Sequence, residues 1–169
     1  MDLPTEIIPH THRLATPKDF EKVYDLYMDR SSNPYLTYDQ MDKPEFEKIY
    51  NEILPSNTLF VVELDDKVIA SYRLIPKKAR QAHTIYLGGF VVDRSMQGRG
   101  IGNTILNRIK LDVANKGKSR IELTVDIHNE AAIKLYQKTG FEIEGRIRNS
   151  YKRVPGDQYL DEYLMGLIL

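Results

Sequence analysis

The sequence predicts a single α/β domain. Its 169 residues, of which 41% are hydrophobic, suffice for one sizeable core but would leave two separate cores small. Segments rich in β-branched residues alternate with segments whose apolar residues recur at helical spacing. The clearest unit spans residues 85–103, where an apolar run ends in a glycine-rich turn and a helical pattern follows. We therefore expect strands and helices to be mixed along one chain.

Charge and cysteine content exclude several classes of partner and site. The chain has 24 basic and 24 acidic residues, so no net charge favours nucleic acid or an anionic membrane surface as a partner. The absence of cysteine excludes disulfides, thiolate metal sites and a cysteine nucleophile, and we expect no metal site. The first residues lack a signal-peptide pattern, and no apolar stretch approaches the ~20 residues of a membrane span. We expect a cytoplasmic protein.

The N-terminal third is predicted to hold a short strand and two helices. Residues 1–9 are expected to form a flexible leader, which leaves 10–169 for the domain. Thr16 and Pro17 suit the N-cap and the first position of a helix. The polar loop over residues 30–42 either borders a ligand pocket or is a solvated connection. The expected elements are a strand at His12–Ala15 and helices over Lys18–Asp29 and Pro44–Leu54.

Three strands are predicted next. A turn at Asp65 and Asp66 joins two strands of β-branched character into a hairpin. The third strand contains Gly88 and Gly89, and glycine inside a strand often marks a bulge or a close backbone approach. The expected strands are Thr58–Leu64, Lys67–Ile75 and Ala82–Val92.

The turn after the third of these strands has the features of an anion site. A helix follows the turn, because apolar residues recur there every four positions from Ile101 to Val113. The first turn of a helix has backbone N–H groups without intrahelical partners and lies at the positive end of the helix dipole. The glycines that would let a phosphate approach this backbone are Gly98, Gly100 and Gly102.

Spacing separates the glycine motifs that could explain this turn. A dinucleotide fingerprint starting at Gly98 would need glycine where Asn103 stands. A P-loop that ends in Gly117-Lys118-Ser119 would need glycine where Asp112 stands. The segment Gln97-Gly98-Arg99-Gly100-Ile101-Gly102 instead resembles the Q/R-x-x-G-x-G/A pyrophosphate loop of the Gcn5-related N-acetyltransferase (GNAT) superfamily. A purely structural glycine turn is the alternative.

The C-terminal part contains a second motif of the same superfamily. The segment Val125–Phe141 resembles the signature V-x-x-x-N-x-x-A-x-x-L-Y-x-x-x-G-F, with Asn129, Ala132 and Tyr136 at matching positions. An ordinary amphipathic helix with a glycine C-cap would explain part of this pattern but not the order of both motifs. The expected elements are a strand at Arg120–Ile127, a helix over Glu130–Thr139, and strands at Phe141–Arg148 and Tyr159–Leu169 joined by a loop around 155–157.

The resemblance implies a single-domain GNAT fold and a set of cofactor contacts. It implies a mixed, mostly antiparallel central sheet flanked by helices, with splayed strands that form a cleft for acetyl-coenzyme A. Tyr136 would protonate the departing thiolate, which is reasonable because a phenol of pKa about 10 can exchange a proton with a thiol of pKa about 8.5. The positions that would contact the cofactor are Phe90, Val91, Val92, Gln97, Gly98, Arg99, Gly100, Ile101, Gly102, Asn129 and Ala132.

The implied reaction is transfer of an acetyl group from acetyl-coenzyme A to a primary amine, on a small molecule or a protein N-terminus, by direct attack in a ternary complex. The alternative is a non-catalytic coenzyme A-binding sensor or interaction module, and a homodimer is compatible with either. No single general base is chosen, and each candidate could equally be a surface or hydrogen-bonding residue. The candidates are Asp126, His128, Tyr86 and His83.

The sequence also leaves the identity of the acceptor amine undetermined. The C-terminal stretch resembles the branch that holds ribosomal-protein N-terminal, spermidine and small amino-acid-like acetyltransferases, and these differ in substrate. Basic residues stand among the acidic residues that could attract a cationic amine, so the local charge does not distinguish between these substrates. The acidic residues are Glu142, Glu144, Asp157, Asp161 and Glu162.

Overall fold

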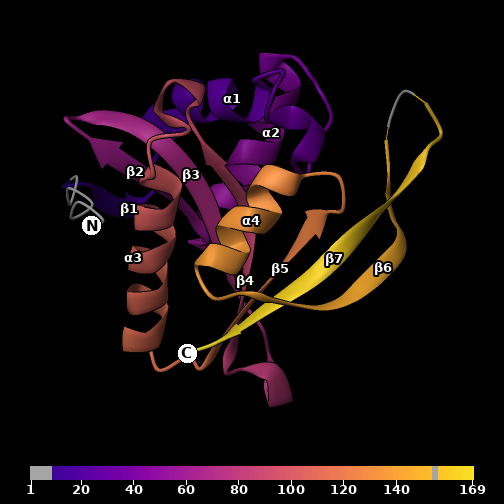
Figure 1. Ribbon diagram of the computed structural model, residues 1–169. Helices are drawn as coiled ribbons and strands as arrows, with labels where there is room; N and C mark the ends of the chain where they lie inside the picture. The colour runs from indigo at the N-terminus through magenta and orange to yellow at the C-terminus, as the bar shows by residue number, and fades with distance from the viewer. Residues whose placement is uncertain (1–8, 154–155) are drawn as a thin grey trace.

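The computed structural model describes residues 9–153 and 156–169, which form a seven-stranded sheet with helices on both faces (Figure 1). The strands are β1 (Thr11–Leu14), β2 (Leu59–Leu64), β3 (Lys67–Pro76), β4 (Thr84–Val92), β5 (Arg120–Asp126), β6 (Glu142–Lys152) and β7 (Tyr159–Ile168). The helices are α1 (Phe20–Met28), α2 (Lys43–Ile53), α3 (Ile101–Asn115) and α4 (Glu130–Lys138). Residues 1–8 of the expected leader, and Pro155 of the expected C-terminal loop, lie outside the described residues.

The sheet has the order β1-β2-β3-β4-β5-β7-β6. Every neighbouring pair is antiparallel except β4 and β5, which confirms a mixed, mostly antiparallel sheet. The parallel pairing is short, because it joins only Thr84–Tyr86 to Arg120–Glu122. Beyond these residues β5 keeps its pairing with β7, and β4 keeps its pairing with β3. The two central strands therefore diverge toward their C-terminal ends and leave an opening between them.

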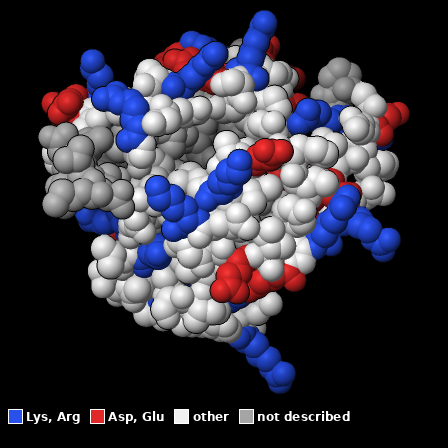
Figure 2. All heavy atoms as spheres, viewed as in Figure 1, with Lys and Arg blue, Asp and Glu red and all other residues white. Residues whose placement is uncertain are grey.

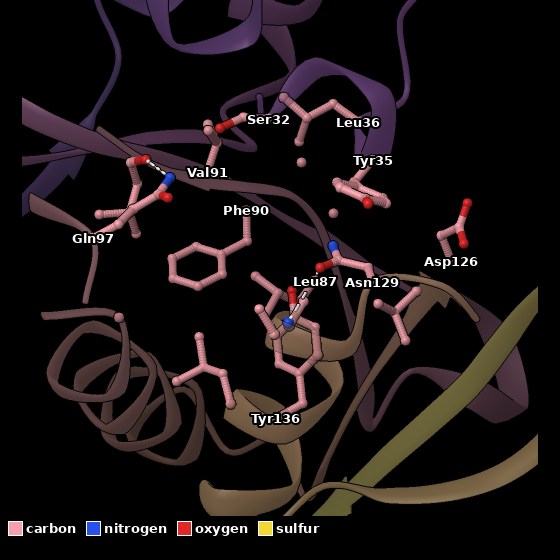
Figure 3. A pocket seen from close by; sticks show the side chains of 18 of the residues that line it. Ser32, Tyr35, Leu36, Leu87, Phe90, Val91, Gln97, Asp126, Asn129 and Tyr136 are labelled. Atoms are coloured by element: carbon pink, nitrogen blue, oxygen red, sulfur yellow. Dashed lines mark hydrogen bonds between the residues drawn. The ribbon is translucent and has the colours of Figure 1, made fainter. Parts of the chain in front are cut away.

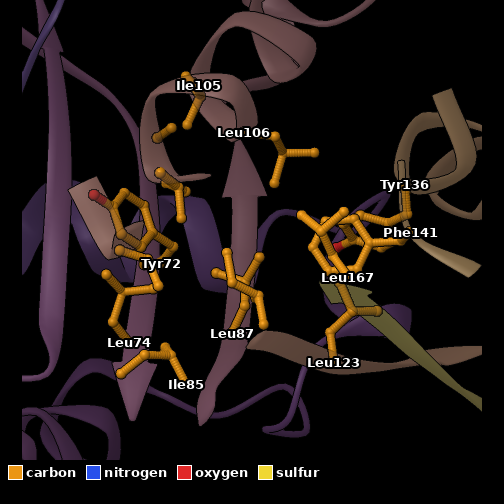
Figure 4. Close-up of a cluster of buried hydrophobic side chains, with 14 of the residues drawn as sticks. Tyr72, Leu74, Ile85, Leu87, Ile105, Leu106, Leu123, Tyr136, Phe141 and Leu167 are labelled. Atoms are coloured by element: carbon orange, nitrogen blue, oxygen red, sulfur yellow. The ribbon is translucent and has the colours of Figure 1, made fainter. Parts of the chain in front are cut away.

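Helix α3 fixes the position of the glycine-rich turn against the sheet. Its apolar stripe is fully buried, so the predicted periodicity is confirmed. Figure 4 shows this stripe packed against side chains of the sheet that include Tyr72 and Leu87. Helices α3 and α4 share this face of the sheet (Figure 1). The stripe residues, each no more than 1% exposed, are Ile101, Ile105, Leu106, Ile109 and Val113.

Helices α1 and α2 cover the opposite face with an aromatic cluster. Phe46 of α2 lies 5.5 Å, ring to ring, from Tyr27 of α1, and both side chains are buried. The same cluster includes Val61 and Val91 of the sheet. This packing holds the end of α1, and the loop that follows it, beside strand β4.

Two of the differences between predicted and observed boundaries have a clear cause in the structure. The predicted helix over Lys18–Asp29 starts as a separate 3-10 turn at Pro17–Asp19, because the Asp19 carboxylate accepts the backbone N–H of Thr16 at 2.7 Å and holds this turn tight. Strand β5 ends at Asp126 instead of Ile127, because the Asp126 carboxylate accepts the backbone N–H of His128 at 2.7 Å and turns the chain. His128 is therefore in a turn and not on the strand.

The last hairpin is longer than predicted. Strand β6 continues past Arg148 to Lys152, because after a bulge Tyr151 and Lys152 pair again with β7. The hairpin projects from the rest of the sheet (Figure 1). No helix of the described part of the chain is long and apolar enough to cross a membrane.

Candidate functional site

A cavity of about 770 Å³ lies where β4 and β5 diverge. Its walls come from β4, β5, α4, the turn before α3, the connection between α1 and α2, and the β6–β7 hairpin. Figure 3 shows Gln97 and Asp126 at opposite sides of the cavity, with Phe90, Asn129 and Tyr136 between them. The loop over residues 30–42 therefore borders a pocket, which was one of its two interpretations.

Strand β4 contains the expected bulge, and it lies in the wall of the cavity. Two residues, Gly89 and Phe90, stand opposite the single residue Tyr72 of β3, because Val91 pairs with Ser71 and Gly88 with Arg73. Only glycine suits position 89. Its φ is +57°, and an added Cβ would lie 2.2 Å from the hydroxyl oxygen of Tyr27.

The bulge is supported from the α1 side. The buried Tyr27 hydroxyl donates to the carbonyl oxygen of Gly89 at 3.3 Å. A bulge leaves backbone polar groups of the strand without a ladder partner. The bulge therefore interrupts the ladder with β3 at Phe90, on the wall of the cavity where an extended ligand could pair with the backbone.

The glycine-rich turn presents open backbone to the same cavity. Gly98 and Gly100 have φ values of +72° and +78°, and an added Cβ at either would meet nothing within 4 Å. Gly100 is the N-cap of α3, and no acidic residue lies in the first turn of that helix. Such an N-terminus, with its free N–H groups, favours an anion. Gln97 ties the turn to β4 by donating its side-chain N–H to the carbonyl of Val92 at 2.9 Å.

Helix α4 forms the opposite wall and places Tyr136 in the cavity. Its N-cap is Asn129, whose side-chain oxygen accepts the backbone N–H of Ala132 at 3.3 Å. Gly102 lets α3 and α4 approach closely, since an added Cβ would lie 3.1 Å from the side chain of Leu135. Tyr136 packs edge-on against Phe141, with ring centres 5.7 Å apart.

The hydroxyl of Tyr136 keeps its proton at neutral pH and can act as a proton donor. The residue is 7% exposed, and within the described part of the chain its hydroxyl has no hydrogen-bond partner. Burial, helped by the nearby Tyr86, raises the pKa of Tyr136 well above that of a free phenol. The hydroxyl is therefore protonated at neutral pH and is available to a group in the cavity.

The predicted site residues come together with one exception. The turn residue Arg99 does not line the cavity; it is exposed, and its guanidinium contacts the sulfur of Met96 at 3.6 Å. The predicted residues that do line the cavity are Phe90, Val91, Val92, Gln97, Gly98, Gly100, Ile101, Gly102, Asn129, Ala132 and Tyr136.

The four candidates for a general base are placed differently. Tyr86 and Asp126 line the cavity, whereas His128 is exposed beside Asp126 and His83 is exposed just before β4. The Tyr86 hydroxyl shares a hydrogen bond of 2.9 Å with the hydroxyl of Thr124. Burial acts to raise the pKa of Asp126, but hydrogen bonds from Tyr151 and His128 outweigh burial and lower it. Asp126 is therefore a stable carboxylate and a weak base.

The sequence did not show which residues would gather at the Asp126 side of the cavity. Tyr151 lines the cavity and donates to the Asp126 carboxylate. Of the acidic residues considered for amine binding, Glu162 alone lines it. The segment around Tyr35 lines it too, and its only signal was the polar composition of the loop. These residues are far apart in sequence, and only the fold brings them together.

Comparison with known proteins agrees with this geometry. A model described as "Acetyltransferase (GNAT) family" matches residues 20–141. The L-amino acid N-acetyltransferase AaaT of Escherichia coli (strain K12) is 27% identical over 161 residues, which cover 92% of this chain and 96% of that protein. The N-alpha-acetyltransferase RimI of Mycobacterium tuberculosis is 42% identical over 74 residues, which cover 44% of this chain and 42% of that protein.

A solved structure shares the fold. The spermidine N-acetyltransferase of Vibrio cholerae, crystallised with CoA and spermine, has a TM-score of 0.80 at 23% identity, over 94% of this chain and 95% of that chain. The overall fold thus recurs in a protein of low sequence identity. The family model itself covers most of the chain. The protein therefore belongs to the acetyltransferase (GNAT) family, and it is an N-acetyltransferase whose co-substrate is acetyl-coenzyme A.

Proposed function

We propose that this protein acetylates a primary amine, on a small molecule or a protein N-terminus, by direct attack of the amine in a ternary complex with acetyl-coenzyme A. One observation carries the proposal. A single cavity joins an open anion-binding turn, a bulged strand, and the hydroxyl of Tyr136, which has no hydrogen-bond partner in the part of the chain that the structure describes. These are the three features that binding a phosphorylated thioester and releasing its thiol would require.

The residues of the cavity suit each part of the co-substrate. The turn at Gly98 and Gly100 would hold the pyrophosphate through backbone N–H groups, with Arg99 approaching the phosphates from outside. The backbone of Phe90 to Val92 would pair with the extended pantetheine arm. The space above both glycines and the absence of acidic residues in the first turn of α3 support this fit. Figure 2 shows basic side chains gathered over α3 and α4, which would favour the anionic cofactor.

The chain would contribute orientation and proton transfer. Bound acetyl-coenzyme A supplies an acetyl group already activated as a thioester, so no acyl-enzyme is needed. A backbone N–H beside the bulge, at Phe90 or Val91, would donate to the oxygen on which negative charge develops. Tyr136 would give its proton to the departing sulfur. Its raised pKa keeps Tyr136 protonated at neutral pH, so the proton is in place when negative charge appears on the sulfur.

A thiol-release assay with a panel of amines tests the proposal. The panel would hold polyamines, amino acids, aminoglycosides and short peptides with free N-termini, and mass spectrometry would identify the acetylated product. We expect thiol release that depends on one class of amine. Calorimetry would measure coenzyme A binding in parallel. Binding without amine-dependent release would contradict acetyl transfer to an amine and would favour a binding module.

A further inference from the structure

Two carboxylates stand side by side at the end of the cavity opposite the glycine turn. Asp126 of β5 and Glu162 of β7 are directly opposite each other in the antiparallel register, and both line the cavity. The side chain of Asp126 is 4% exposed. Like charges directly opposite on neighbouring strands destabilise a sheet. The fold therefore carries a local cost that a bound cation would relieve.

Neither carboxylate has a Lys or Arg partner among the described residues. Asp126 accepts hydrogen bonds from the hydroxyl of Tyr151 and from the backbone and ring of His128, the ring nitrogen at 3.0 Å. Glu162 accepts one from the hydroxyl of Ser150 at 2.5 Å. These donors orient the oxygens without neutralising two charges. The end of the cavity is thus acidic in a chain that has no net charge overall.

No Lys or Arg lines this end of the cavity in the described part of the chain. Lys138 lines the cavity from the last turn of α4, nine residues after Asn129, which is about 13.5 Å along the helix axis. Arg153 stands just outside the lining, where its guanidinium donates to the carbonyl of Pro34 at 2.6 Å and also interacts with the hydroxyl of Tyr151. A carboxylate on the acceptor would therefore meet two negative charges at the cavity wall, to which Arg153 does not contribute.

The contact between Arg153 and Pro34 also limits the size of the acceptor. It joins the β6–β7 hairpin to the connection between α1 and α2, and both of these segments line the same end of the cavity through Tyr151 and Tyr35. A bridge between the two walls narrows the way in for a polypeptide end. Tyr136, whose hydroxyl faces the cavity without a hydrogen-bond partner among the described residues, marks where the reacting group would sit.

We infer that the acceptor is a small amine that carries a second cationic group and no carboxylate, and that Asp126 and Glu162 bind this second cation. The inference rests on the proposed acetyl transfer and names the substrate class of the same site. Tyr35 and Tyr151 would add aromatic faces to which a cation is attracted. Glu162 determines specificity at a distance from the reacting atoms and takes no part in proton transfer.

Matched acceptors test the inference directly. Cadaverine, lysine and pentylamine share one carbon chain and differ only in the α-carboxylate or the second ammonium group, and agmatine and arginine form a second matched pair. Binding of the second cationic group by a buried carboxylate should raise kcat/KM on the order of tenfold to a hundredfold over an acceptor that lacks this group. We expect cadaverine and agmatine to exceed lysine, arginine and pentylamine by such a factor. Equal use of all five would overturn the inference and leave acetyl transfer standing.

The variant Glu162→Gln locates the effect. Glutamine keeps an oxygen for the Ser150 hydroxyl but removes the charge, so the advantage of cadaverine over pentylamine should disappear. The control Glu142→Gln removes a carboxylate from an exposed position that does not line the cavity. It should change the turnover of neither cadaverine nor pentylamine. An unchanged cadaverine preference in Glu162→Gln would contradict the assignment. Turnover of other amines of the wider panel, but of neither cadaverine nor agmatine, would also overturn it, whereas coenzyme A binding without turnover of any amine would instead refute the proposed function.

Discussion

The Gln97 end of the cavity is made of backbone, whereas the Asp126 end is made of side chains. At the Gln97 end the contacts on offer are the N–H groups of a glycine turn and of a bulged strand, all contributed by residues 88–102. At the Asp126 end they are carboxylates and hydroxyls contributed by four segments that include Tyr35, Tyr151 and Glu162. A backbone site binds one invariant ligand through geometry. A side-chain site can be altered one residue at a time without disturbing the other end.

Tyr136 stands between the two ends, and its loss should have the largest effect. Tyr136→Phe removes the proposed acid but keeps the ring that packs on Phe141, so kcat should fall by about 100-fold or more while coenzyme A affinity stays nearly unchanged. Steady-state kinetics with calorimetry would measure both. The control Tyr50→Phe removes a buried hydroxyl that donates to Thr16, away from the cavity, and should leave kcat intact. Equal loss of turnover and affinity would make Tyr136 a structural residue.

The next largest effect is expected from Gly100→Val. The side chain would enter the open space above the turn and strain a backbone with φ of +78°, so coenzyme A should bind about 10- to 100-fold more weakly. Calorimetry would measure the dissociation constant. Gly117→Val is a matched control, because Gly117 has φ of +72° and equally open surroundings at the other end of α3. If both variants weaken binding alike, strain and not an anion site explains the loss.

The backbone-built end could be predicted from the sequence because its residues are contiguous. The two motifs fixed Gly98 to Gly102 and Asn129 to Tyr136, and periodicity fixed α3 from Ile101 onward. Backbone conformation depends on local sequence, and positive φ strongly favours glycine, so a turn of this kind has a local signature. The bulge in β4 was also indicated by local sequence, because Gly88 and Gly89 stand inside the strand.

The side-chain end could not be predicted in this way. Glu162 was one of five acidic residues with equal standing until the register placed it opposite Asp126. That register joins β5 to β7, two strands far apart in the sequence, and a shift of one residue would turn Glu162 to the other face. Tyr151 was assigned to a loop, because the continuation of β6 beyond Arg148 depends on pairing with β7 and not on local sequence. Non-local pairing decides this end, and single-sequence patterns do not report it.

A smaller effect should come from Asp93, which follows β4 and anchors the backbone-built end to α1 through Lys22. Partial burial acts to raise the pKa of Asp93, but Lys22 and Ser95 outweigh it and hold the pKa at about 2. A depressed carboxyl pKa stabilises the fold above the unfolded value of 3.8, and this stability is lost as pH falls toward about 2. Asp93→Asn should therefore cost about 1 to 2 kcal/mol at neutral pH, and the difference from wild type should shrink below pH ~4.

Urea denaturation at several pH values would measure this cost. Asp39→Asn serves as the control, because Asp39 is exposed and has no ion pair among the described residues. We expect coenzyme A affinity of the folded Asp93→Asn protein to change by less than about threefold, since the turn binds through backbone. A large loss of affinity would mean that the Gln97 end depends on side chains as strongly as the Asp126 end does.

The smallest effect should come from the bridge over the side-chain end. Arg153→Met removes the hydrogen bond to the carbonyl of Pro34 while keeping most of the side-chain length, so the two walls should separate more easily. A partly exposed contact of this kind is worth little, and we expect kcat/KM for peptide N-termini to rise about two- to fivefold with coenzyme A affinity unchanged. Arg148→Met removes an exposed arginine from the same hairpin and should have no such effect. If Arg153→Met instead weakens coenzyme A binding, the two ends are mechanically coupled, and a backbone site and a side-chain site could not then change independently.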